Sequence, residues 1–375
     1  MIYLDNAATT FPKPPEVVRA VKEFMENSGG NPGRGGHELS RRAGDIVYNC
    51  REALAELFNI DNPERIVFTK NATEAINTAI NGIVGEGDEI IISGMEHNSV
   101  LRPAVAKEQL GSRLKIVPAD RDGRITPEAV EAMLTPRTKL VCVIHASNVV
   151  GTVNDIAAIN DVVHSYGALT LFDAAQTAGL LPIDASDFDF FAFAGHKGLY
   201  GPTGTGGLYV REGLMPRPLT MGGTGSISES AIMPDIFPDR LEAGTVNAAG
   251  IAGLLEGVNF VKTQAPGEHE HKLAKKLAEK IGGINSAEIM GDNGVNVVGV
   301  RLRNIDCVDA AARLDSEYGV ASRGGLHCSP LAHRSMGSIG CGLLRLSTGA
   351  FTTEEDIDAA AKALEEIIKN QNTAH

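Results

Sequence analysis

The amino-acid sequence predicts an α/β protein with a mostly parallel sheet in a large domain, followed by a smaller α/β domain. Short, β-branched and mostly apolar runs alternate with helical segments from about residue 66 onward, a pattern typical of parallel strands covered by helices on both faces. The 375 residues, 43% of them hydrophobic, exceed one ordinary domain and can bury a substantial core. We expect an N-terminal arm at 1–15 that packs with the small domain, a large domain at 16–250 and the small domain at 251–375.

Individual elements follow from local patterns. Residues 14–25 are amphipathic and begin at two prolines, which predicts a helix. A final helix is expected over 352–370, opened by a capping box of Thr352 and Glu355. Further helices are expected at 73–84 and 154–167, and strands at 65–69, 89–94, 114–119, 139–147, 168–175, 188–194, 295–302 and 343–348.

Composition narrows the class of ligand. The net charge of −13 disfavours nucleic acid and anionic membranes as partners, so a small polar metabolite is expected. The sequence has no run of eighteen apolar residues and no signal-peptide pattern at its start, which predicts a cytosolic protein. Neither a disulfide framework nor a metal site is indicated, because the cysteines are odd in number and scattered. They are Cys50, Cys142, Cys307, Cys328 and Cys341.

Polar residues of complementary kinds follow the ends of the expected strands. Each alone has an ordinary explanation: a threonine or aspartate there often caps the next helix, and a single lysine or histidine is usually solvated. Together they favour a site, because the carboxyl ends of parallel strands meet at one edge of the sheet. The residues are Ala72 and Thr73 at a helix start, His97, Asn148, Asp173, Gln176, His196 and Lys197.

A phosphorylated pyridine aldehyde, pyridoxal 5'-phosphate, needs this set of groups. Lys197 would hold the aldehyde as a Schiff base, and Asp173 would keep the ring nitrogen protonated so that the ring accepts electrons. His97 would stack on the ring and would also transfer protons during the reaction, because imidazole titrates near neutral pH. Gln176 and Asn148 would tune the phenolic oxygen of the ring. Phosphate suits the helix start at 72–73, where unpaired N–H groups and the helix dipole favour an anion. Glycines after the lysine let the backbone pass close beside the ring.

Seven motifs along the chain carry a family resemblance. They are YLDNAATT, EHNSV, HASNVVGT, DAAQTAG, GHKGLYGPTGTGG, EAGTVN and RGGLHCSP, which span nearly the whole chain in order. The sequence resembles the cysteine desulfurase family (NifS/SufS-like) of the class V aminotransferases. The resemblance implies the type I fold of pyridoxal-phosphate-dependent transferases, with a seven-stranded sheet in the large domain. It also implies conversion of L-cysteine to L-alanine, with the sulfur held on an enzyme cysteine as persulfide.

The resemblance also implies particular roles for residues of the C-terminal half. Cys328 would be the nucleophile that takes the sulfur, and Arg345 would grip the substrate carboxylate, with Arg334 as a weaker candidate. Arg323 and Asn148 would also contact the substrate. From the residues themselves, the neighbouring His327, with Arg323, would favour the thiolate electrostatically.

Assembly and partners follow from the same resemblance. Thr245 would reach across a dimer interface to the neighbouring subunit's phosphate, which implies a homodimer. A sulfur-acceptor protein is expected, and iron–sulfur cluster assembly, tRNA thiolation and cofactor synthesis remain open. Two positions depart from many family members: Ala194 stands where a serine hydroxyl is common, and Leu326 stands where a second histidine is common.

Three alternatives to the desulfurase stay open on sequence alone. A selenocysteine lyase would use the same apparatus with L-selenocysteine. A transaminase or carbon–carbon lyase would leave Cys328 idle. A cofactor-free binding protein would keep only the fold.

Overall fold

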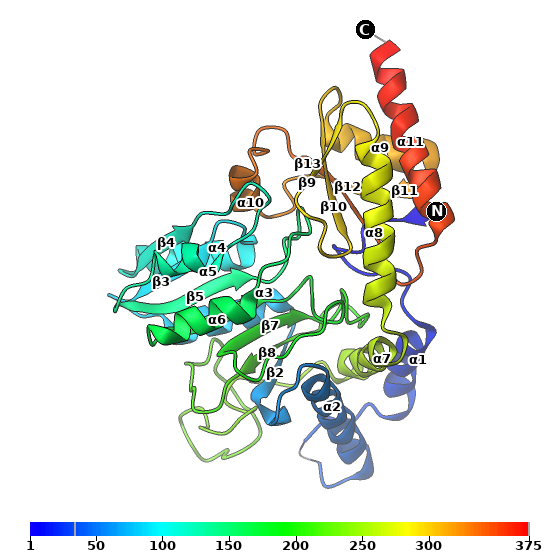
Figure 1. Cartoon of the computed structure of the whole chain (residues 1–375). Coiled ribbons are helices and arrows are strands. Elements are labelled where there is room, and N and C mark those ends of the chain that lie inside the picture. Colours follow the sequence, from blue (N-terminus) through cyan, green and yellow to red (C-terminus); the bar gives the residue numbers. More distant parts are fainter. Residues whose placement is uncertain (34, 374–375) are drawn as a thin grey trace.

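A seven-stranded sheet forms the centre of the larger part of the protein (Figure 1). The structure, a computed structural model, describes residues 1–33 and 35–373. The strand order is β2-β8-β7-β6-β5-β3-β4, and only β8 runs antiparallel to its neighbours, which confirms the mostly parallel sheet. The strands are β2 (Ile66–Thr69), β3 (Glu89–Ser93), β4 (Arg113–Val117), β5 (Thr138–Ile144), β6 (Leu169–Asp173), β7 (Phe190–Ala194) and β8 (Gly206–Val210).

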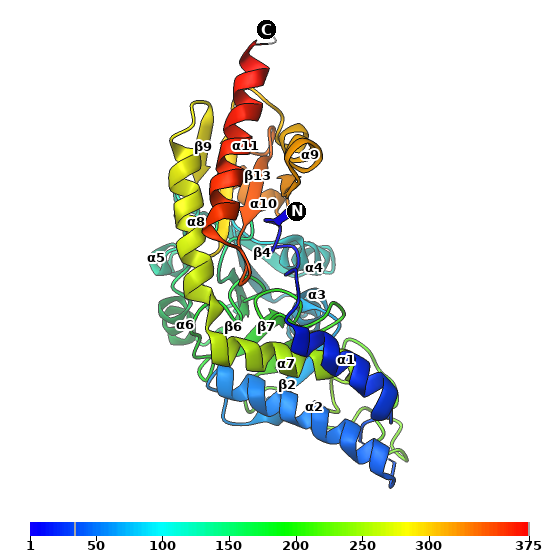
Figure 2. The same cartoon turned by 90° about the vertical axis from the view of Figure 1, so that its right-hand side faces the viewer.

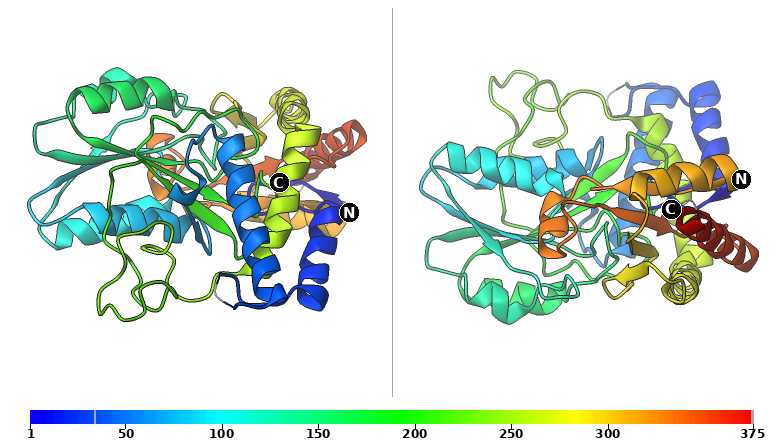
Figure 3. Two further views of the ribbon diagram at one scale, coloured as in Figure 1. Left: turned by 90° about the horizontal axis from the view of Figure 1, so that it is seen from below. Right: turned by 90° about the horizontal axis from the view of Figure 1, so that it is seen from above.

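The central strands are apolar throughout because both faces of the sheet are covered. In β5, Val141 and Val143 join one buried cluster, whereas Leu140 and Cys142 join the cluster on the opposite face. Helices α3 (Ala72–Ile83) and α4 (Asn98–Gln109) contact each other, as do α5 (Pro127–Glu131) and α6 (Ile156–Ser165). Figure 3 shows these two pairs on opposite faces of the sheet.

Three helices form a layer at the end of the large part. Helix α7 (Ala248–Gln264) lies against both α1 (Pro15–Asn27) and α2 (Glu38–Leu57) (Figure 2). The sequence pattern predicted α1 but no element for α2, one of the two longest helices among the described residues. A short 3₁₀ turn, η1 (Pro63–Arg65), leads from this layer into β2.

The smaller part contains a second, antiparallel sheet with the strand order β12-β13-β10-β9. Its strands are β9 (Ala287–Met290), β10 (Val297–Leu302), β12 (Arg323–Gly325) and β13 (Leu343–Ser347). Helices α8 (Pro266–Gly282), α9 (Cys307–Tyr318) and α11 (Glu354–Thr373) pack beside it, and α10 (Pro330–Ser335) joins β12 to β13. The N-terminal strand β1 (Ile2–Tyr3) pairs with β11 (Val320–Ala321) of this part.

The division after residue 250 stays a prediction. Residue 34 of the expected large domain and the last two residues of the expected small one lie outside the described residues. Within the described residues, α7 lies against the large part, whereas α8 contacts β9, β10 and α11. No helix in the described ranges is long and apolar enough to cross a membrane.

The expected capping box of the last helix is wrong by one position. The hydroxyl of Thr353 accepts from the N–H of Asp356 at 3.2 Å, and the carboxylate of Asp356 accepts from the N–H of Thr353 at 2.9 Å. Thr352 instead accepts from the N–H of Gly349. Its hydroxyl is therefore used by the preceding turn rather than by the helix.

Candidate active site

A cavity of about 250 Å³ opens at the carboxyl edge of the parallel strands. The small part closes one side of it through the segments around 323–328 and 345. Thr245 and Arg334 do not line it. The lining includes all the other expected site residues: Ala72, Thr73, His97, Asn148, Asp173, Gln176, His196, Lys197, Arg323, Cys328 and Arg345.

The start of α3 provides an anion cradle beside this cavity. Asn71 caps the helix, with its side-chain oxygen accepting from the N–H of Glu74 at 2.9 Å. The N–H groups of Ala72 and Thr73 lie in the first turn, where helix geometry provides no partner for them. Gly206 allows the close approach of β8, because a Cβ atom there would lie 2.8 Å from the backbone of Asn71. The cradle can therefore bind a phosphate group.

Asp173 ends β6 as a buried carboxyl, 3% exposed. One oxygen, Oδ1, accepts from the N–H of Ala175 at 2.9 Å. The other, Oδ2, has only a 3.5 Å contact with the hydroxyl of Ser99 within residues 1–33 and 35–373. Burial raises the pKa of this carboxyl above its usual value. A weakly engaged carboxyl oxygen in such a position can bind the N–H of a cationic ring.

Lys197 lies in the loop between β7 and β8, at the same edge. Burial lowers the pKa of its amine to about 8, although the nearby Asp173 opposes that shift. Within the described residues its Nζ has no hydrogen-bond or ion-pair partner, whereas the Thr10 hydroxyl donates to the carbonyl of Lys197. About a tenth of this amine is then neutral at pH 7, far more than for an ordinary lysine, so it can act as a nucleophile and a base.

His97 caps α4 with its own ring. Nδ1 accepts from the N–H of Ser99 at 3.0 Å, which places the ring proton on Nε2. Burial, followed by the charge of Lys197, lowers the pKa of the imidazole to about 4. The expectation that this ring titrates near neutral pH is therefore wrong. His97 is a neutral ring with an Nε2–H donor.

The N-terminal arm supports two further lining residues. The side-chain amide of Gln176 donates to the carbonyl of Ala7 at 3.1 Å, which leaves its oxygen available. The carbonyl of His196 accepts from the N–H of Thr10 and from the amine of Lys13. The Nδ1 atom of His196 is buried and has no hydrogen-bond partner among the described residues. It thus remains available to a ligand.

Cys328 lies in the loop that joins β12 to α10, and its side chain is exposed. His327 and Cys328 both adopt positive φ angles, 50° and 58°. The His327 ring is neutral rather than cationic. Its Nε2 donates to the carbonyl of Leu343 at 3.0 Å, and burial lowers the pKa of the ring to about 3. The expectation that His327 favours the thiolate by its charge is therefore wrong, because a neutral imidazole supplies none.

The arginines of the site differ in their surroundings. Arg345, on β13, is 2% exposed; one terminal nitrogen pairs with Asp5 at 2.8 Å and the other donates to the carbonyl of Asn148. Its Nε–H has no partner in the described part of the chain. Arg323 is exposed at the mouth of the cavity, and Arg334 lies on the exposed surface of α10, away from it.

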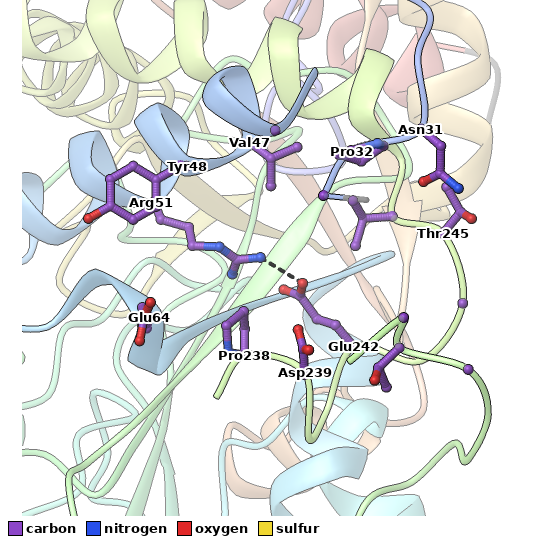
Figure 4. A pocket seen from close by; sticks show the side chains of 17 residues that line it. Asn31, Pro32, Val47, Tyr48, Arg51, Glu64, Pro238, Asp239, Glu242 and Thr245 are labelled. Atoms are coloured by element: carbon purple, nitrogen blue, oxygen red, sulfur yellow. Dashed lines mark hydrogen bonds and ion pairs between the residues drawn. The ribbon is translucent and has the colours of Figure 1, made fainter. Parts of the chain in front are cut away.

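Thr245 lies outside this cavity, in an exposed loop that lines a second one of about 580 Å³. Figure 4 shows it beside Asn31 and Pro32, and the same pocket is lined by the exposed Tyr48 and by the ion pair of Arg51 and Glu242. The ion pair joins the two side chains at 2.6 Å and is almost fully buried. Within one chain, Thr245 is therefore not brought to the other expected site residues.

Several contributing residues escaped the sequence analysis. Asn71 had a readable signal, since an asparagine three residues before a glutamate is a common helix start. Asp5, Ala7 and Ser99 lie within the motifs YLDNAATT and EHNSV, but nothing in those motifs indicates their contacts. Asp5 pairs with a residue 340 positions away, a separation at which no local pattern exists.

The fold and the site together define a class of protein: a type I transferase fold whose sheet edge carries a reactive lysine, a buried aspartate and an anion cradle. The chain belongs to the family described as Aminotransferase class-V, which matches residues 2–360. Within it the chain belongs with the cysteine desulfurases, and the resemblance read from the sequence motifs is confirmed by the following comparisons.

Relatives match over almost their full length. A probable cysteine desulfurase of Methanothermobacter thermautotrophicus is 36% identical, covering 98% of this chain and 94% of the relative. A cysteine desulfurase of Escherichia coli is 34% identical, covering 98% and 93%. Among solved structures, the apo cysteine desulfurase of Thermococcus onnurineus NA1 superposes with a TM-score of 0.90 at 30% identity, over 98% of this chain and 95% of that one. The S-sulfonic acid form of the Escherichia coli cysteine desulfurase CsdA gives 0.89, again at 30% identity and with the same coverage.

Proposed function

We propose that this protein is a pyridoxal 5'-phosphate-dependent cysteine desulfurase that converts L-cysteine to L-alanine and receives the sulfur on Cys328. One observation carries the proposal: the exposed thiol of Cys328 lines the same cavity as the amine of Lys197 and the carboxyl of Asp173. Membership of the class V aminotransferase family and the similarity to relatives named cysteine desulfurase also support this assignment of the reaction.

The groups present fit pyridoxal phosphate. The weakly engaged Oδ2 of Asp173 suits a ring nitrogen, and the unpartnered Nζ of Lys197 suits the aldehyde. The α3 cradle and the unpartnered Nδ1 of His196 suit the phosphate. Ala194 lacks a hydroxyl for it, a loss of about 1 kcal/mol if water substitutes. The neutral His97 ring would stack on the pyridine, and Gln176 and Asn148 would lie by the phenolic oxygen.

Different residues of the chain would bind the substrate, transfer its proton and accept its sulfur. When bound, the cofactor supplies an electron sink for negative charge on the substrate α-carbon. Arg345, through its free Nε–H, and Arg323 would hold the substrate carboxylate. Lys197, with a pKa of about 8, would take the α-proton onto Nζ. The Cys328 thiolate would then attack the substrate sulfur, and the bond between that sulfur and the substrate β-carbon would break with its electron pair passing to the carbon. Protonation of that carbon would give alanine, while Cys328 retains the sulfur as a persulfide.

The second cavity supports a homodimer as part of the proposal. Thr245 would face the partner subunit's phosphate cradle rather than its own. Large apolar side chains are exposed near this cavity, which is a common feature of an interface. They include Leu219, Met221, Ile227, Ile232 and Ile236. Light scattering of the purified protein tests this assembly, and the mass of a single chain would contradict it.

The persulfide on Cys328 would pass to a sulfur-acceptor protein, and we place the reaction in the cytosol. The proposed activity is tested by mass spectrometry of the protein after incubation with pyridoxal phosphate and L-cysteine. We expect one added sulfur on the peptide that contains Cys328, together with free alanine. Alanine without sulfur on that peptide would contradict the role of Cys328. A reaction only with L-selenocysteine would identify a selenocysteine lyase instead.

A further inference from the structure

The side-chain amide of Asn148 is bonded to the cysteine loop on both sides of Cys328. Its nitrogen donates to the carbonyl of His327 at 2.8 Å, and its oxygen accepts from the hydroxyl of Ser329 at 2.7 Å. The carbonyl of Cys328 itself accepts from the N–H of Asn98 at 2.8 Å. The three residues at the centre of the loop are therefore each held by the large part.

These bonds use only half of the capacity of Asn148. A carboxamide has two N–H donors and an oxygen with two lone pairs. The loop takes one N–H and one lone pair, and Asn148 also lines the cavity. One donor and one acceptor site thus remain for a ligand in the cavity. A single side chain can contact that ligand and hold the thiol loop at the same time.

The backbone of the loop needs such support. His327 and Cys328 are consecutive non-glycine residues with positive φ angles, a region that is sparsely populated and persists only where the surroundings determine it. The side chain of Ser329 is fully buried, and among the residues that the structure describes its hydroxyl makes one side-chain hydrogen bond, the one to Asn148. That hydroxyl is thus the point at which the loop can be loosened with the smallest chemical change.

We propose that Ser329 is a positioning residue, which with Asn148 forms a clamp that sets the thiol of Cys328 over the cavity and links occupancy of the cavity to the thiol. This inference rests on the proposed role of Cys328. In the clamp, Ser329 contacts neither substrate nor cofactor. It acts through the two bonds that Asn148 makes on either side of the nucleophile.

Ser329→Ala tests the clamp by two measurements with opposite expected directions. Without the hydroxyl, persulfide formation on Cys328 should slow by roughly fivefold in kcat, while KM for L-cysteine changes less than about twofold. In protein free of cofactor, alkylation of Cys328 by iodoacetamide should become roughly fivefold faster, because the thiol samples more orientations. General weakening of the small part would also lower kcat and speed alkylation of Cys328, but it would in addition speed alkylation of the buried Cys307, which loss of the clamp should leave unchanged.

Ser335→Ala is the matched control, because the Ser335 hydroxyl also ties this segment to the large part, at the carbonyl of Gly94, but away from Cys328. It should leave both rates within about twofold of the unmodified protein. Equal rates in Ser329→Ala and the unmodified protein would overturn the clamp, as would equal effects of the two variants. If the unmodified protein forms no persulfide on Cys328, the proposed function fails, whereas the alkylation rates still decide whether the clamp exists.

Discussion

The two halves of the site are built in different ways. The cofactor half comes from the carboxyl ends of β2, β3, β5, β6 and β7, whose positions are determined by sheet pairing and two buried cores. The thiol half is one loop of the small part, held across the cavity by a few hydrogen bonds around Cys328. Binding of the cofactor should therefore depend on the whole large part, whereas sulfur transfer should depend on a few hydrogen bonds that single substitutions can remove.

We expect the largest effect from a substitution that disables the cofactor half of the site. Lys197→Ala removes both the covalent attachment point and the base, so alanine production should fall by about a thousandfold or more. Pyridoxal phosphate should still bind through the remaining groups, without a covalent bond after borohydride treatment. Mass spectrometry and an alanine assay measure both outcomes. Lys362→Ala, at an exposed position on α11, is the control and should behave as the unmodified protein. Near-normal turnover in Lys197→Ala would contradict the assignment.

A substitution that disables only the thiol half should have a smaller effect. Cys328→Ser should lower alanine release by about a hundredfold, because a serine hydroxyl does not accept sulfur from the substrate. The absorbance change of the cofactor on adding L-cysteine should persist, since the other half is intact. Cys341→Ser changes the other exposed thiol of the small part and should leave the rate unaltered. Loss of the absorbance change in Cys328→Ser would show that the cofactor half does not work independently of the thiol half.

The pH dependence of cofactor attachment tests how burial and Asp173 set the pKa of Lys197 in the cofactor half. Only the neutral amine of Lys197 attacks an aldehyde, and its pKa is lowered to about 8. The rate of covalent attachment to cofactor-free protein should therefore rise about tenfold per pH unit below 8 and level off above it. Because Asp173 raises the pKa of Lys197, Asp173→Asn should move the inflection to lower pH. Absorbance during titration with pyridoxal phosphate measures this, and an inflection near 10.5 or an upward shift would contradict it.

Local patterns were sufficient for most of the fold. Alternating apolar strands and helices predicted the parallel sheet because each strand is buried on both faces and each helix on one. The same patterns gave no element for α2, α4, α5, α9 or α10. They also misplaced the cap of α11, because both Thr352 and Thr353 have an acidic residue three positions later. The neighbouring turn decides between them.

The amino-acid sequence was enough to predict that a lysine, an aspartate and a helix start share one edge, because apolar strands that alternate with helices run parallel and bring their carboxyl ends together. The folded structure was needed to show that His97 and His327 are neutral, since burial lowers the pKa of both rings. It likewise decided that Asp5 pairs with Arg345 and that Asn148 brackets the thiol. These contacts join residues that are 179 to 340 positions apart, and their energies depend on desolvation, which a linear pattern does not contain.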